Sequence, residues 1–139
     1  SERGQNAEVK QFGQMMVRDH TKAAEELKQA VTAHNITLPT ELDDEHRDLI
    51  DKLRNLRGAE FDREYIAAMV DGHEEMQDLL EGRVEDARDA SPSGPAGTED
   101  AANAAINQWA LKAKPTVDQH LKTAQQIQDK LQANRNTTN

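Results

Sequence analysis

Residues 8–33 read EVKQFGQMMVRDHTKAAEELKQAVTA, and this stretch decides the fold class. Its apolar side chains, joined by one histidine, recur at steps of three or four residues, which is the period of one face of an α-helix. The members of this face are Val9, Phe12, Met16, His20, Ala23, Leu27 and Val31. The pattern predicts a helix that buries one side against neighbouring elements.

Three further stretches have the same period, and they predict helices at about 40–56, 60–89 and 98–133. Their apolar faces are Leu42, His46, Leu49, Leu53 and Leu56; Ile66, Met69, His73, Met76, Leu80 and Val84; and Ile106, Trp109, Ala113, Val117, His120, Ala124, Ile127 and Leu131. No run alternates between apolar and polar residues, so the sequence predicts no strand. We therefore expect an all-α, up-and-down helical bundle.

Proline and glycine mark the ends of these segments. We expect Gly58 to end the second helix and the run ASPSGPAG at 90–97 to form a loop. Pro115 lies inside the last segment, where it should kink or break the helix. The polar tail at 134–139 should fray.

Composition limits the class of protein. The 139 residues correspond to one domain, spanning 1–139, and the absence of cysteine excludes disulfides and thiolate metal sites. The net charge of −9 comes without a basic stripe, which argues against nucleic-acid binding. No stretch approaches the roughly 20 apolar residues of a membrane span.

A short pattern occurs once in each of the three long segments. A histidine follows a valine by three residues at Val17 and His20, at Val70 and His73, and at Val117 and His120. Residues three apart share a helix face, so each histidine should point toward the core with its valine. Each histidine lies near the middle of its segment, so antiparallel packing should bring all three within about one or two helical turns of one level.

Two interpretations of the three histidines remain open at this stage. His20, His73 and His120 can supply the protein ligands of an open zinc site, or they can hold copper or nickel. Alternatively, they are neutral core residues that form hydrogen bonds to each other, to Tyr65, to Asp19 or to the backbone. The aspartates that precede them, Asp19, Asp71 and Asp118, should be solvated or should accept hydrogen bonds from the histidines.

Three methionines lie about one helical turn from these histidines. Met16, Met69 and Met76 are additional candidate ligands, and thioether sulfur would favour copper. Methionine at helical spacing also fills cores, which is the alternative role for all three.

The sequence lacks the residue patterns of several well-known classes of enzyme. Di-iron bundles use Glu-x-x-His, and valine stands at the glutamate position here. The chain has no Ser-His-Asp order, no phosphate-binding glycine loop and no His-Glu-x-x-His. The sequence therefore favours a protein that is not an enzyme.

Four blocks of the chain, taken in order, resemble the DUF4142 family of ferritin-like bacterial proteins. They are FGQMMVRDHTKA at 12–23, GAEFDREYI at 58–66, VDGHE at 70–74 and PTVDQHL at 115–121. The resemblance implies a ferritin-like bundle and an exported, periplasmic location, but no established activity. Signature positions of the family fall on His20, His73 and His120, and also on Asp19, Phe61, Asp62 and Tyr65.

Members of this family usually carry another amphipathic helix before the segment that begins here at Glu8. A bundle without that helix would expose an apolar groove. We expect a second copy of the chain to cover this groove, which gives a homodimer.

The functional hypothesis is an exported helical bundle that binds copper or zinc through His20, His73 and His120. Its role would be storage, buffering or stress protection. The alternative is a metal-free structural or protein-interaction module of the cell envelope.

Overall fold

The computed structural model describes residues 2–41, 43–89 and 98–136. This part of the chain forms four α-helices and contains no strand: α1 (Ala7–Thr32), α2 (Asp44–Arg54), α3 (Gly58–Asp89) and α4 (Thr98–Asn136). The prediction of an all-α bundle is therefore confirmed. The predicted loop at 90–97, Leu42 and the last three residues of the predicted tail lie outside the described residues.

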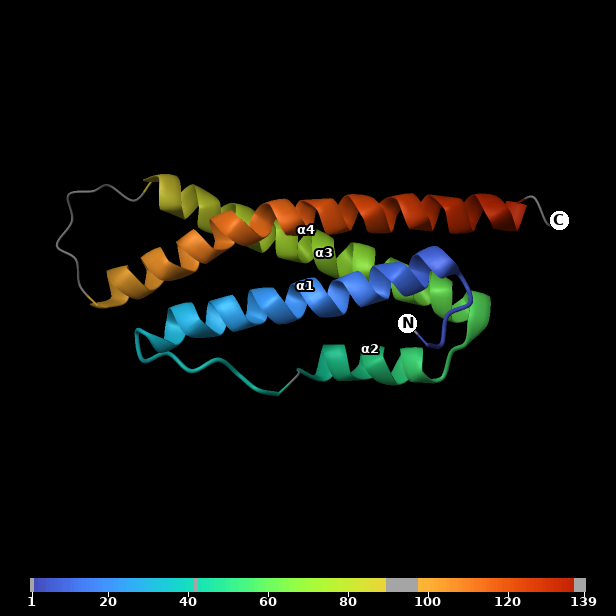
Figure 1. Cartoon of the computed structure of the whole chain (residues 1–139), viewed down its shortest axis with the longest axis horizontal. Helices are drawn as coiled ribbons and strands as arrows, with labels where there is room; N and C mark the ends of the chain where they lie inside the picture. Colours follow the sequence, from blue (N-terminus) through green and yellow to red (C-terminus); the bar gives the residue numbers. More distant parts are fainter. Residues whose placement is uncertain (1, 42, 90–97, 137–139) are drawn as a thin grey trace.

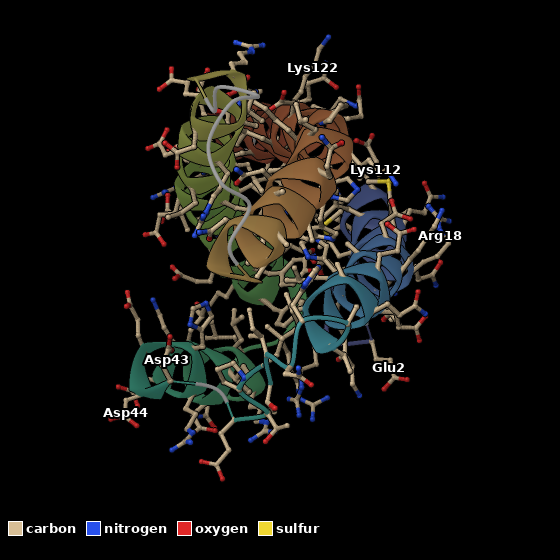
Figure 2. The ribbon with its side chains drawn as sticks, turned by 90° about the vertical axis from the view of Figure 1, so that its left-hand side faces the viewer. Glu2, Arg18, Asp43, Asp44, Lys112 and Lys122 are labelled. Atoms are coloured by element: carbon tan, nitrogen blue, oxygen red, sulfur yellow. The ribbon has the colours of Figure 1, made fainter. Side chains whose placement is uncertain are left out.

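Helices α1, α3 and α4 build the bundle, and α2 lies beside it. Helix α4 packs against both α3 and α1, whereas α2 contacts α3 (Figure 1). Helix α2 contains no buried side chain. Figure 2, which labels Asp43 and Asp44 at its start, shows α2 apart from the other three helices. None of the described helices is both long and apolar enough to cross a membrane.

The core consists of two apolar clusters along the bundle. The larger cluster joins α1, α3 and α4 and contains Val9, Phe12, Met16, Ile66, Val70, Leu121, Ala124 and Ile127. The smaller one contains Leu80, Ala110 and Val117. Burying one large apolar side chain contributes about 1.5–3 kcal/mol. The clusters therefore hold α1, α3 and α4 at a defined height relative to one another.

Capping residues set the first turns of α1 and α2. The side chain of Asn6 accepts hydrogen bonds from the backbone N–H groups of Glu8 (2.8 Å) and Val9 (3.2 Å). Asp43 accepts one from the N–H of His46 at 2.9 Å. These caps satisfy N–H groups that have no partner inside the helix. Because Asp43 caps it, α2 begins at Asp44, four residues later than the apolar pattern predicted.

One of the predicted helix breakers, Gly58, has a different role from the one expected. Gly58, expected to end the second helix, is instead the first residue of α3. Its φ of 59° lies in the left-handed region that favours glycine, and its N–H donates to the carbonyl oxygen of Arg3 at 2.9 Å.

Pro115 does not break α4, which continues through it to Asn136. Proline has no N–H to donate to the carbonyl of Leu111 one turn earlier, and this loss bends helices. Figure 1 shows α4 changing direction between its orange first part and its red second part. Of the two predicted effects of Pro115, the break is wrong and a bend is present.

Candidate metal centre

The bundle brings three histidines together from three helices. The ring centroids of His20 (α1), His73 (α3) and His120 (α4) lie 5.3, 5.5 and 5.6 Å apart in pairs. One ring nitrogen from each histidine lies within 4.8 Å of the other two. The three histidines therefore lie at a common level along the bundle, as their positions near the middle of the three segments predicted.

The three rings differ in their exposure. His73 and His120 are only 5% and 2% exposed, whereas His20 lies at the solvent-exposed edge of the cluster. Val17, which was expected to be buried with His20, is 71% exposed, so that prediction is wrong. Met16 is the buried neighbour instead, because the covered face of α1 ends between positions 16 and 17.

The hydrogen bonds of His73 identify its free nitrogen. Its Nδ1 lies 2.7 Å from the backbone oxygen of Met69. A carbonyl oxygen only accepts, so Nδ1 carries the proton and Nε2 of the neutral ring has the lone pair. This Nε2 lies 3.3 Å from Nε2 of His20. Two nitrogens on a tetrahedral ion with bonds of about 2.0–2.1 Å would also be about 3.3 Å apart.

His120 is fixed in a similar way. Its Nε2 donates to Oδ2 of Asp19 at 2.9 Å, since a carboxylate only accepts. The lone pair of the neutral ring is therefore on Nδ1, which is buried and has no hydrogen-bond partner among the described residues. Metal-ligating histidines usually donate their other N–H to a carboxylate or a backbone carbonyl. Both His120 and His73 have this arrangement.

Burial of the histidine cluster favours neutral imidazoles. Arg18 donates to Oδ1 of Asp19 at 2.8 Å, and this bond, followed by that from His120, lowers the pKa of Asp19. Burial lowers the pKa of His73, and enclosure by neighbouring atoms is also the main cause that lowers the pKa of His20. Because only the neutral ring binds a metal, the lowered values favour ligation at neutral pH.

These shifts predict that the metal-free protein is less stable at pH 5 than at pH 7.5. The unfolded histidines have pKa values of about 6.5, above those of folded His20 and His73. Below about pH 6.5 the unfolded chain therefore binds more protons than the folded chain. The stability that these histidines contribute is complete above that pH and is lost as the pH falls through their pKa values in the folded protein. Thermal melts of the wild type and His73→Gln at both pH values, in the presence of a chelator, measure this loss of stability. Between pH 7.5 and pH 5 the Tm of the wild type should fall further than that of His73→Gln, and equal falls would contradict the prediction.

The methionines fall into two groups. Met16 belongs to the larger apolar cluster and Met69 packs against it, which is the core-filling alternative for these two residues. Met76 is 37% exposed and lines an open pocket together with His20 and His120. Ligation by any of the three stays a prediction.

Three aspartates, Asp19, Asp71 and Asp118, precede the histidines in sequence. Of these, Asp19 alone has a hydrogen bond to one of the three histidines. Asp118 instead accepts hydrogen bonds from Gln77 (2.7 Å) and Lys114 (2.9 Å), and Asp71 is exposed. Tyr65, a possible partner for the histidines, stacks on Phe61 with ring centroids 5.5 Å apart. The sequence named Asp19 as a possible hydrogen-bond partner of the histidines, and the packing of α1 on α4 brings it to His120.

Comparison with protein families gives a match over most of the chain. The model of a domain of unknown function, DUF4142, matches residues 1–91. No curated protein and no solved structure shows significant similarity to the chain. The matched range includes His20 and His73, whereas the block around His120 lies beyond it.

Proposed function

The chain belongs to the DUF4142 family, whose function is unknown, and from this premise we propose that it binds one zinc or copper ion through His20, His73 and His120. One observation carries the proposal: a ring nitrogen of each histidine lies within 4.8 Å of the other two. The hydrogen bonds of His73 to Met69 and of His120 to Asp19 support it, because they orient two of the rings.

The donor set favours zinc or copper over a carboxylate-bound iron centre. Imidazole nitrogen suits both ions, and three histidines form the protein part of an open zinc site. A carboxylate-rich iron site is disfavoured because Val17, Val70 and Val117 occupy the positions that glutamate takes in di-iron bundles. The carboxylate that contacts His120, that of Asp19, already accepts hydrogen bonds from Arg18 and His120.

We propose storage, buffering or stress protection rather than catalytic turnover as the role of this site. An exported location is part of the proposal, and it is supported by the family resemblance. The homodimer also stays a prediction.

A second candidate function, that of a metal-free interaction module, is favoured by a different observation. Hydrogen bonds join His20 to His73, His73 to Met69, and His120 to Asp19, as they would in a polar core that needs no metal. The buried Nδ1 of His120 is the atom that this network leaves without a partner. Metal retention therefore separates the two functions.

Elemental analysis after gel filtration tests the proposal. Untagged protein is incubated separately with copper, zinc, iron and manganese. We expect about one equivalent of zinc or copper, as three histidines on one ion require. The variants His20→Ala, His73→Ala and His120→Ala should each lose it.

The controls are His34→Ala and His46→Ala, which remove histidines outside the cluster. His46 forms an ion pair with Asp43 at 2.6 Å, on the separate helix α2. Both controls should keep the metal. Circular dichroism must show that each cluster variant remains helical. A folded wild type that retains no metal would overturn the proposal in favour of the interaction module.

Asp19→Asn is expected to weaken metal binding about 10–100-fold, because the amide no longer supports His120 as a carboxylate does. The matched control is Asp118→Asn, which makes the same change next to Lys114 and Gln77 and should leave affinity unchanged. Competition with a chromophoric chelator measures both. Equal losses in the two variants would show that net charge, and not the bond to His120, is responsible.

A further inference from the structure

A cavity of about 460 Å³ opens beside the histidine cluster, and His20 and His120 form part of its wall. We call it the histidine pocket. His20 lies at the exposed edge of the cluster, so a small molecule can reach the cluster through this opening. The volume falls within the range of about 300–1,000 Å³ that is usual for small-molecule sites.

One wall of the histidine pocket is apolar and fixed in place. It includes Trp109, Ala113 and Val117 from α4. The indole Nε1 of Trp109 donates to the backbone oxygen of Ala23 on α1 at 2.9 Å, which ties the ring across two helices. Trp109 and Ala113 also pack against the smaller core cluster. A ligand can therefore stack on this indole without ordering it first.

Two lysines at the edge of the histidine pocket can contact an anion. Lys22 and Lys112 line the pocket with Glu26. Among the described residues, the lysines that form ion pairs are Lys52, Lys114 and Lys130, so neither pocket lysine is paired. Asp19 is already paired with Arg18. Figure 2 shows Lys112 where α4 and α1 lie together. A divalent ion held by three neutral imidazoles would add its full charge beside this rim.

We propose that the histidine pocket binds a small organic carboxylate whose apolar body packs on Trp109 and whose anionic group faces the histidine-held metal. The inference rests on the proposed function, because the ion supplies the main attraction. Three protein ligands leave a fourth position of a tetrahedral ion for an external ligand. His20 and His120 are the two ligands that border the cavity.

Titration of the cobalt(II)-loaded protein with acetate and with benzoate tests the proposal, since the visible bands of cobalt(II) report changes in its ligands. Both anions should change the spectrum. Benzoate should act at about tenfold lower concentration, because one aromatic contact is worth about that factor in binding.

Three variants separate the parts of the proposal. Trp109→Leu should retain cobalt and lose the preference for benzoate. Lys112→Gln should weaken both anions by a similar factor. Lys122→Gln is the matched control on the same helix, because Lys122 is exposed and points away from Lys112 in Figure 2, and it should change neither.

The outcomes distinguish this inference from the function on which it rests. Failure of the wild type to retain cobalt or any of the four metals above would overturn both. Retained cobalt whose bands respond to neither anion would overturn the carboxylate site alone. Equal affinity for acetate and benzoate, or an unchanged preference in helical Trp109→Leu, would also overturn it.

Discussion

Replacing Phe12 with alanine is expected to lower the free energy of unfolding by about 3–5 kcal/mol. The side chain is 2% exposed and belongs to the larger core cluster. Its ring centroid lies 6.4 Å from that of His73 and 6.5 Å from that of His120. The substitution therefore leaves a cavity where α1 meets α3 and α4, and neighbouring side chains fill such cavities only in part.

Val17→Ala is the matched control, because it also shortens an apolar side chain of α1. Val17 is 71% exposed, so this change should alter stability by no more than about 0.5 kcal/mol. Urea denaturation of the metal-free proteins, followed by circular dichroism, measures both variants. Similar losses in the two would contradict the placement of Phe12 inside the bundle and Val17 outside it.

Asp62→Ala is expected to cost about 3 kcal/mol, the other large effect on stability. Asp62 is 1% exposed, and its Oδ2 accepts hydrogen bonds from the backbone N–H groups of Gln5 (3.2 Å) and Asn6 (2.9 Å). A hydrogen bond to a charged group contributes roughly 1.5–3 kcal/mol. This carboxylate thus fixes the segment that leads into α1 against the first turns of α3.

The neighbouring Gly4 provides a specific test of this role. A Cβ at Gly4 would overlap Oδ1 of Asp62, so Gly4→Ala should cost about 1–3 kcal/mol alone. In the Asp62→Ala background it should cost less, because the overlapping atom is gone. Asp71→Ala, which removes an exposed carboxylate from the same helix, is the control for charge. Additive effects of the changes at 4 and 62 would exclude direct contact between them.

Periodicity predicted the helices well because a long amphipathic face is a local property. Helix α3 begins at Gly58 and α4 ends at Asn136, two and three residues from the predicted limits. The least accurate limits are those of α2, which was predicted to extend from about Thr40 to Leu56 but extends from Asp44 to Arg54. A single side chain, Asp43, sets its start, and the apolar spacing contains no information about such a cap.

The sequence also predicted which residues form the candidate metal centre. Because His20, His73 and His120 lie near the middle of their segments, antiparallel packing was expected to bring them within about one or two helical turns of one level. It did not predict that Val17 would be exposed, because the edge of a covered face depends on which helices lie against α1. It did name Asp19 among the possible hydrogen-bond partners of the histidines, and the structure shows this contact with His120.

The amino-acid sequence by itself determined the all-α class, the four helical segments and the central position of one histidine in each of the three long segments. The tertiary structure alone decided how these histidines are oriented. The hydrogen bond from His120 to Asp19 joins residues 101 positions apart, and that from His20 to His73 joins residues 53 apart. Local periodicity is set by neighbours within about one turn of a helix, whereas such distant contacts exist only after the core has fixed the relative positions of α1, α3 and α4.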